Sequence, residues 1–201
     1  MNIIFDFDGT IADSLGSVVE LLNIEASKRG WEEFTAADIR KKGIGKILVS
    51  HKITGWKLYY IVWKMRRELG KKISEIEIFE GLPEAIRVLG KKHKLGIITS
   101  NSSKNVREFL AKYDLLGEFD YIDDSMNFYG KDKKLIKTLK KYSLDPTETV
   151  YVGDEKRDRD AAVKSGLGFV GVSWGYERPE SLRSSGIKKV MTKTEDLVEA
   201  F

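Results

Sequence analysis

The sequence contains no cysteine and no glutamine, and only three of its 201 residues are proline. Without cysteine, the chain has no disulfide, no thiolate metal site and no cysteine nucleophile. It also has no apolar run of about 18 residues, the length that a transmembrane helix needs. The first residues enter an apolar, strand-like segment and show no signal peptide. We therefore expect a cytoplasmic protein with no membrane partner.

Neither sign of charge dominates, because the sequence contains 35 lysines and arginines and 31 aspartates and glutamates, which gives a formal net charge of +4. This excess is too weak to indicate a nucleic-acid partner, and it favours small anionic ligands only slightly. The length allows one good core, or a core with a small inserted domain. The high content of Lys and Glu leans towards a thermophilic source.

The pattern of apolar residues predicts an α/β protein with a helical insert. Residues 2–8 read as a strand, and the segment from Asp13 or Ser14 to about Lys28 reads as a helix. Residues 35–78 read as wholly helical, with segments that begin near Thr35, near Lys46 and at Trp56. After residue 81, strands alternate with helices of about ten residues, which is typical of a parallel sheet. The expected strands there are 94–100, 121–122, 149–152, 169–172 and 188–191, and the expected helices are 83–92, 103–113, 132–142, 157–165 and 194–200.

This alternation predicts a Rossmann-like parallel sheet core with helices on both faces. The core consists of residues 1–13 and 81–201, and residues 14–80 form a small all-helical domain inserted after the first strand.

Two aspartates stand where the first apolar run ends. Asp6 and Asp8 follow Ile3-Ile4-Phe5, and Gly9 supplies a sharp exit. Burying an unpaired carboxylate is unfavourable, so a structural role would favour Val or Ile at these positions. Ser100, Asn101 and Asp154 follow two other expected strands. Because the carboxyl ends of parallel strands meet at one sheet edge, these groups are expected to converge there. Carboxylate oxygens suit Mg²⁺.

Four short motifs occur in order along the chain, each at a strand end or a helix start. They read Asp6-Phe7-Asp8-Gly9-Thr10, Thr99-Ser100-Asn101, Gly130-Lys131 and Val152-Gly153-Asp154-Glu155-Lys156-Arg157-Asp158. With them, the chain resembles the phosphatases of the haloacid dehalogenase superfamily over its full length. It departs from the usual third motif, because Asp132 and Lys134 stand where prolines often follow.

The resemblance implies a role for each motif residue. Asp6 resembles the nucleophile that becomes an aspartyl-phosphate, and Asp8 resembles the general acid and base. It also implies a Mg²⁺ ion held by the Asp6 carboxylate, the Asp8 carbonyl and Asp154. The implied substrate-binding residues are Thr10, Ser100, Asn101 and Lys131, and Asp158 is expected to orient Lys131 or a metal-bound water.

Plainer interpretations stand beside several of these assignments. Ser100 and Asn101 could cap the following helix, and Lys133 or Lys134 could replace Lys131 because lysine runs usually form a solvated face. The pair Asp123-Asp124 matches no motif and is expected to form a solvated turn. His51 and His93 are expected at the surface. Residues 174–176 could wall the active site or could serve ordinary packing.

In this superfamily, an insert after the first motif is a mobile helical cap, and residues 14–80 match that place. Residues 41–46, with three lysines and two glycines, are expected to face the pocket, unless they form an exposed basic loop. Residues 56–69 present a broad apolar surface, expected as cap core or as a contact with another subunit. A membrane-surface helix is the less favoured alternative.

The motif spellings and Val172-Ser173-Trp174-Gly175-Tyr176 most resemble phosphoglycolate phosphatase-like members. We therefore expect a Mg²⁺-dependent phosphatase that hydrolyses a small phosphorylated metabolite and acts as a monomer or as a homodimer through the cap. The motifs imply the reaction and not the substrate, because related enzymes act on sugar phosphates, nucleotides and phospho-acids. A sugar phosphomutase of the same superfamily and a receiver-like signalling domain are the alternatives, and a metal-free dehalogenase would leave Asp8 and Asp154 without a purpose.

Overall fold

The computed structural model describes residues 1–124 and 130–201. In this part of the chain, six strands form one sheet in the order β3-β2-β1-β4-β5-β6, and every neighbouring pair is parallel. The strands are β1 (Asn2–Phe5), β2 (Lys94–Thr99), β3 (Tyr121–Asp124), β4 (Thr149–Gly153), β5 (Gly168–Val172) and β6 (Val190–Met191). The predicted α/β fold with a parallel sheet is confirmed.

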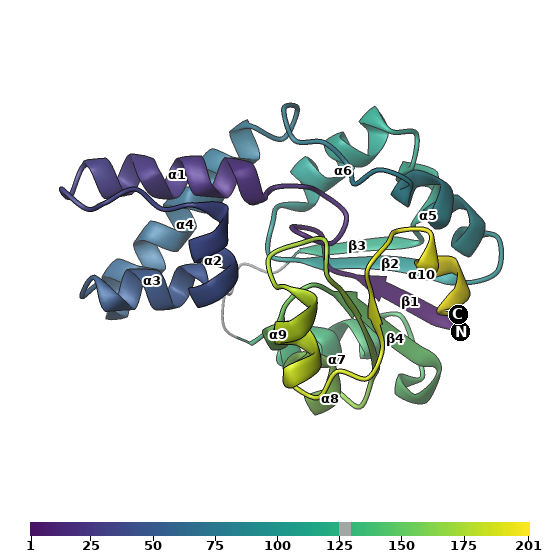
Figure 1. Cartoon of the computed structure of the whole chain (residues 1–201). Coiled ribbons are helices and arrows are strands. Elements are labelled where there is room, and N and C mark those ends of the chain that lie inside the picture. The colour runs from purple at the N-terminus through teal and green to yellow at the C-terminus, as the bar shows by residue number, and fades with distance from the viewer. Residues whose placement is uncertain (125–129) are drawn as a thin grey trace.

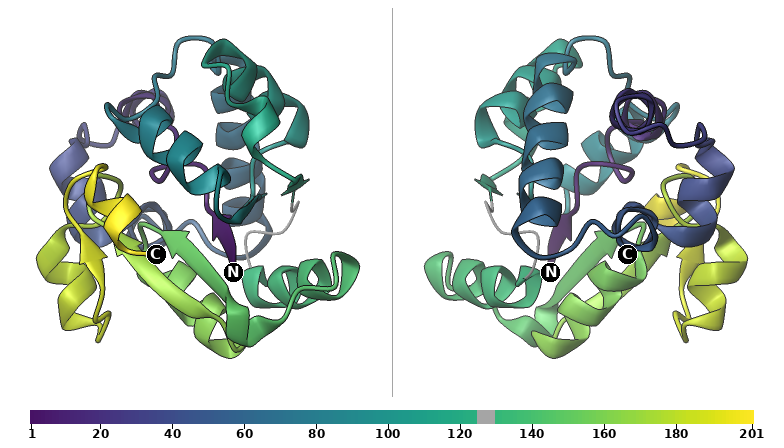
Figure 2. Two further views of the ribbon diagram at one scale, coloured as in Figure 1. Left: turned by 90° about the vertical axis from the view of Figure 1, so that its right-hand side faces the viewer. Right: turned by 90° about the vertical axis from the view of Figure 1, so that its left-hand side faces the viewer.

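Both faces of the sheet are buried, which explains why β1 reads as an unbroken apolar run rather than an alternating one. Ile3 and Phe5 pack into one cluster with helices α5, α6 and α10, whereas Ile4 packs on the opposite face with α7 and α8. Figures 1 and 2 show these two layers on either side of the strands. These helices are α5 (Leu82–Gly90), α6 (Ser103–Lys112), α7 (Lys131–Lys141), α8 (Lys156–Lys164) and α10 (Asp196–Glu199). A further short helix, α9 (Pro179–Ser184), lies beside β6 and was not predicted from the sequence pattern.

Four helices between β1 and α5 lie beyond the carboxyl ends of the strands (Figure 1). They are α1 (Leu15–Ser27), α2 (Ala36–Lys42), α3 (Ile44–Ser50) and α4 (Gly55–Lys71). Thr35 and Asp38 form a reciprocal capping box at the start of α2, and Gly43, with a φ of 76°, separates α2 from α3. The division of the chain at residues 13 and 81 stays a prediction.

The helical prediction for residues 35–78 is wrong at its end. Helix α4 stops at Lys71, and residues 72–81 return to the sheet without a regular helix. Ile73 and Ile76 are buried in this segment, so their spacing imitates a helical face. No helix in residues 1–124 or 130–201 is long and apolar enough to span a membrane.

Candidate active site

The candidate site lies where the sheet order reverses. Strand β1 stands between β2 and β4, and the chain adds later strands on opposite sides of it. In open α/β sheets, ligands bind in the crevice at the carboxyl ends of such strands. Asp6 follows β1 at this place, and its backbone N–H donates to the Val152 carbonyl on β4 at 2.8 Å. Asp6, Asp154 and Asp158 each offer a carboxylate oxygen here, and these oxygens lie within 4.8 Å of one another.

A tight loop after β1 delivers Asp6 and Asp8 to this edge. The N–H groups of Thr10, Ile11 and Ala12 all donate to the Phe7 carbonyl, at 2.8–3.2 Å. Gly9 adopts a φ of 80°, and a Cβ atom on it would lie 2.3 Å from Asp154 Oδ2. Both the backbone angle and the space therefore require glycine at this position.

Asp154 is fully buried and firmly held. Its Oδ1 accepts from the Thr10 hydroxyl at 3.1 Å, and its Oδ2 accepts from the Tyr176 backbone N–H at 2.7 Å. Thr10, which the resemblance suggests as a substrate-binding residue, thus donates its hydroxyl to Asp154. A Cβ atom on Gly175 would lie 2.1 Å from the Gly9 carbonyl, so these two loops are in close contact around Asp154.

Lys131 lies between two of the carboxylates. Its Nζ donates to Asp6 Oδ2 at 2.7 Å and to Asp158 Oδ1 at 2.6 Å. Burial opposes its charge, yet Asp158 and Asp6 raise the pKa of Lys131 well above its ordinary value. Lys133 is exposed, and Lys134 pairs with Asp123 at 2.5 Å. Of the three neighbouring lysines, Lys131 is the one that the structure brings to Asp6.

Burial and mutual repulsion raise the pKa of both Asp6 and Asp154, although Lys131 partly offsets this for Asp6. Three carboxylates thus meet in a buried place, where Lys131 pairs with Asp6 and Asp158 and the charge of Arg157 also acts on Asp6. A bound cation would reduce the repulsion among the carboxylates. Among the described residues, Asp8 Oδ1 is also buried without a hydrogen-bond partner. These carboxylates are the hard oxygen donors that Mg²⁺ prefers, so the residues present fit this ion.

Asp8 lies beside this cluster in a different environment. Burial, and then the negative charge of Asp6, raise the pKa of Asp8 to about 6, against hydrogen bonds from Ser14 and Asn101 and the positive charge of Arg66. A carboxyl group with such a pKa exchanges a proton near neutral pH, as a general acid or base requires.

Ser100 and Asn101 follow β2 at the same edge. Ser100 lines the cavity described below, whereas Asn101 is buried. Asn101 Oδ1 accepts from the Ser102 N–H at 2.8 Å and from Asn105 Nδ2 at 3.1 Å. The N-cap of α6 is Ser102, whose hydroxyl accepts from the Asn105 N–H at 3.2 Å. The cap of this helix is therefore neither of the two predicted candidates.

A cavity of about 470 Å³ opens above Asp8 between the sheet edge and the four helices. Residues 41–46 line it, as predicted, together with Ser100 and Tyr176 from the sheet side. Its walls combine aliphatic side chains with charged groups, among which cations outnumber carboxylates. The aliphatic residues are Val18, Ile39, Ile44, Val62, Met65 and Leu69, the cations are Arg40, Lys41, Lys42, Lys46, Arg66, Lys156 and Arg157, and the carboxylates are Asp8, Glu155, Asp160 and Glu177.

Comparison with known proteins identifies the family of this chain. Residues 3–172 match the profile of the haloacid dehalogenase-like hydrolases. The chain belongs to this family. It is 30% identical to a phosphoglycolate phosphatase from Synechococcus elongatus over 98% of its own length and 95% of the relative's, and 29% identical to one from Photorhabdus laumondii over 99% and 91%.

The fold agrees with this assignment. A haloacid dehalogenase-like hydrolase from Streptococcus pneumoniae, 20% identical in sequence, superposes with a TM-score of 0.84 and covers 100% of this chain and 97% of its own. The predicted family and enzyme class, a phosphoric monoester hydrolase, are confirmed.

The expectation of a solvated turn at Asp123-Asp124 is wrong. Both residues belong to β3, where Asp123 is buried and Asp124 is exposed. Asp123 accepts from Lys134 at 2.5 Å and from the Thr138 hydroxyl at 2.8 Å, and these bonds lower its pKa although burial opposes them. Asp123 thereby fixes α7, the helix that begins with Lys131.

Sequence reasoning missed two cationic residues of the insert. Arg66 lies on the same face of α4 as the buried Val62 and Met65, and a cation at that spacing was the available signal. Arg40 in α2 donates to the carbonyls of Gly175 at 3.1 Å and Trp174 at 3.4 Å. Arg40 therefore connects the insert to the loop that holds Asp154.

The same loop is attached at two further points. The Tyr176 hydroxyl and the Ser14 hydroxyl are 2.9 Å apart, and Trp174 Nε1 donates to the Thr10 carbonyl at 3.1 Å. Tyr176 thus lines the cavity, and residues 174–176 together support the site. Ser14 precedes α1 as its N-cap residue, but its hydroxyl is directed to Tyr176 and not to the helix.

Proposed function

We propose that this hydrolase is a Mg²⁺-dependent phosphatase that cleaves a small phosphomonoester through an aspartyl-phosphate intermediate. The observation that carries the proposal is the convergence of Asp6, Lys131, Asp158 and Asp154 within a few ångströms, next to a carboxyl group with a pKa of about 6. Burying three carboxylates this close together is unfavourable unless a ligand or a reaction uses them.

In the proposed first step, an Asp6 carboxylate oxygen attacks phosphorus as the ester P–O bond breaks, and Asp6 becomes an aspartyl-phosphate. Asp8, protonated at this stage, gives its proton to the leaving alkoxide oxygen. In the second step, Asp8 takes a proton from water as that water attacks phosphorus, and inorganic phosphate leaves Asp6. Asp8 has returned to its protonated form, so the cycle is balanced.

Lys131 supports both steps through its charge. Its ammonium group contacts Asp6 at 2.7 Å and keeps this carboxylate ionised despite burial. Asp158 accepts from the same ammonium group at 2.6 Å and so holds Lys131 beside Asp6. Ser100, at the cavity wall, is proposed to donate to a phosphoryl oxygen, with Asn101 beside it.

Asp6, Asp154 and the Asp8 carbonyl are the groups proposed to hold Mg²⁺. When bound, the ion supplies positive charge that lets an anionic phosphate approach anionic Asp6. Thr10 and Tyr176 fix the two oxygens of Asp154 and so set its orientation towards the site.

The substrate is proposed to be a small phosphorylated metabolite with a second anionic group. Support comes from the lysines of residues 41–46 at the cavity wall and from the relatives, which are phosphoglycolate phosphatases. A volume of about 470 Å³ lies within the range of pockets for small organic ligands and accommodates more than a two-carbon phospho-acid. A cytoplasmic location, without a nucleic-acid or membrane partner, belongs to the same proposal.

Trapping of the phosphoenzyme tests the proposed roles. With a labelled, activated aryl phosphate, Asp8→Asn should accumulate labelled protein, because attack still occurs and the intermediate lacks its base. Asp6→Asn should take up no label, because the nucleophile is gone. The opposite pattern would show that the two roles are exchanged.

Turnover separates the alternatives in a second experiment. Release of many phosphates per chain from para-nitrophenyl phosphate supports a phosphatase, whereas one stable label per chain supports a signalling domain. Transfer of the phosphoryl group to a sugar hydroxyl instead of water would indicate a phosphomutase. A screen of metabolite phosphates with Mg²⁺ then identifies the preferred substrate.

A further inference from the structure

Helix α4 carries large aromatic side chains on the face that points away from the site. Trp56, Tyr60 and Trp63 are 74%, 52% and 41% exposed, and Arg67 continues their line. We call these four residues the outer stripe. Tyr59, 54% exposed, flanks it. In the right-hand view of Figure 2, α4 runs along the outside of the helical part.

The spacing of the outer stripe is that of a helix that pairs with another helix. Its positions follow one another by four, three and four residues, the repeat of a coiled-coil seam. The opposite face of α4 is already used, because Ile61, Val62, Met65 and Leu69 are buried against the rest of the insert. Helix α4 therefore has one apolar face that is buried inside the protein and a second apolar face, the outer stripe, that is exposed to solvent.

The outer stripe is complementary to itself. When two copies of α4 run antiparallel, with a two-fold axis between residues 61 and 62, Trp56 lies opposite Arg67 of the other copy. Tyr60 then lies opposite Trp63. Guanidinium over indole and ring against ring are both favourable pairs. Within the chain the same chemistry already occurs, because Arg67 lies 5.8 Å from the Trp63 ring and Tyr60 stacks on Trp63 at 6.1 Å.

The exposed aromatic area is close to what a stable pair needs. At about 200 Å² for a large aromatic side chain, the exposed parts of Trp56, Tyr59, Tyr60 and Trp63 amount to roughly 450 Å² per copy. Two copies would therefore bury about 900 Å² of aromatic surface. Long side chains at the edge of the contact would bury further area, and small specific interfaces bury roughly 1,200 Å² in total. Trp, Tyr and Arg are also the residues that contribute most to binding at interfaces.

We propose that the outer stripe is the interface of a homodimer in which two copies of α4 pack antiparallel about a two-fold axis. The two catalytic cavities lie on the opposite face of α4, so both remain open in this dimer. The proposal does not depend on the proposed function, because none of the stripe residues lines the cavity.

Sedimentation velocity and light scattering over a range of concentrations test the association. The intact chain should be a dimer at micromolar concentration, and Trp63→Glu should weaken association at least about a hundredfold, since each substitution is present twice in the interface. Arg67→Glu should weaken it as well and places two like charges near each other. Val163→Glu, a matched change at an exposed apolar residue of α8, should leave the dimer intact.

Hydrolysis of para-nitrophenyl phosphate and the circular dichroism spectrum show whether each variant is folded. A folded Trp63→Glu variant that remains dimeric would overturn the proposal. So would an intact chain that is monomeric at all concentrations, and binding of that monomer to lipid vesicles would identify a membrane surface as the occupant instead.

Single cysteines test the orientation, and the cysteine-free chain keeps this experiment free of background. About the proposed axis, residues 60 of the two copies lie about 4.5 Å apart along the helices, and residues 56 about 16 Å apart. Tyr60→Cys should therefore cross-link efficiently with a short bismaleimide, and Trp56→Cys should not. Equal cross-linking at both positions would indicate parallel packing and would overturn the antiparallel arrangement.

Discussion

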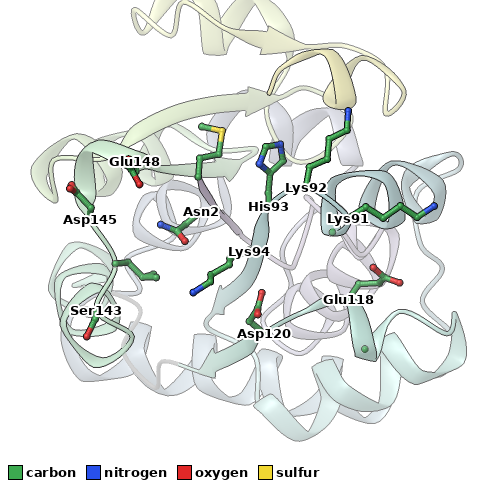
Figure 3. A pocket seen from close by; sticks show the side chains of 14 residues that line it. Asn2, Lys91, Lys92, His93, Lys94, Glu118, Asp120, Ser143, Asp145 and Glu148 are labelled. Atoms are coloured by element: carbon green, nitrogen blue, oxygen red, sulfur yellow. The ribbon is translucent and has the colours of Figure 1, made fainter.

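The two ends of the parallel sheet each carry a cavity, of about 720 Å³ at the amino end and about 470 Å³ at the carboxyl end. The larger one lies beside the first residues of β1, β2 and β4, and it is rich in charged side chains (Figure 3). Volume and charge alone would therefore select the amino end.

Most of the charges at the amino end are exposed, and two of the carboxylates accept hydrogen bonds that serve local structure. Asp120 accepts from the Leu95 N–H at 3.0 Å, and Asp145 accepts from the Thr147 N–H at 2.8 Å. Figure 3 shows Lys91 and Lys92 spread around the rim without converging on one point. Exposed charges and charges with a structural hydrogen bond need no ligand to explain them.

The charges at the carboxyl end are buried and converge. Asp154 and Asp158 are fully buried, and Lys131 bridges Asp158 to Asp6. Such an arrangement destabilises the fold unless a ligand or a reaction uses it. The comparison shows that burial and convergence of charge indicate the site, and that cavity size does not.

Among the tests that compare the two ends of the sheet, removal of the metal should have the largest effect on activity. We expect activity to disappear in excess EDTA and to return with Mg²⁺, because three carboxylates converge at the carboxyl end of the sheet. Asp154→Asn should raise the Mg²⁺ concentration for half-maximal activity by about tenfold to a hundredfold, since one anionic donor becomes neutral at constant shape. Asp145→Asn, the same change at the amino end, should leave this concentration unaltered. Full activity in EDTA would contradict the proposed mechanism.

Burial of Asp8 should also make the metal-free protein less stable as pH rises. The folded protein raises the pKa of Asp8 from 3.8 to about 6, so between these values the folded state binds more protons than the unfolded state. The free energy of unfolding therefore decreases as pH increases through this window, by at most about 3 kcal/mol for this group.

Urea unfolding in EDTA at pH 4.5 and pH 7.5 measures this effect. Asp6 and Asp154, whose pKa values are also raised, change stability in the same direction. Asp8→Asn should reduce the loss, and Asp145→Asn should not. Glu155, whose pKa is raised to about 6, acts in the same direction, whereas Glu25, Glu68 and Glu77, whose pKa values are lowered, act in the opposite one. An Asp8→Asn variant with the same pH dependence as the unchanged protein would show that Asp8 is not desolvated.

The elements that carry the site were predictable because their signals are local. The strand and helix around motif two, expected at 94–100 and 103–113, occur at Lys94–Thr99 and Ser103–Lys112. A short apolar run is enough to predict a buried strand, and a capping residue is enough to predict where the next helix begins. Both signals lie within a few neighbouring residues.

What the sequence pattern missed depends on contacts between distant segments. Asp123 looked solvated because its partners, Lys134 and Thr138, lie on the next helix. Thr10 was assigned to substrate, whereas its hydroxyl bonds to Asp154, 144 residues later. Arg66 was overlooked because nothing in a single helix tells whether a cation on its apolar face meets a cavity or solvent.

The lysines of the insert should have a smaller effect than the metal site, and only on some substrates. If Lys42 or Lys46 pairs with a second anionic group, its replacement by Ala removes a charge-assisted contact of about 1.5–3 kcal/mol. We expect a roughly tenfold to hundredfold decrease in kcat/KM for the best metabolite and almost none for para-nitrophenyl phosphate, which lacks that group. Lys133→Ala, at an exposed lysine outside the cavity, is the matched control. Equal losses on both substrates would show that residues 41–46 act in folding or closure.

The smallest effect is expected at the amino end. Lys94→Ala and His93→Gln change two residues that line the larger cavity, on the strand edge opposite the candidate active site. Because these side chains are exposed or half-buried, the substitutions should alter stability by no more than about 0.5 kcal/mol and kcat/KM by no more than about twofold. Steady-state kinetics with the best metabolite, together with thermal unfolding, measure both. A tenfold loss of activity at unchanged stability would mean that a ligand in the amino-end cavity influences the reaction, and that convergence of buried charge is not the only mark of a functional site in this fold.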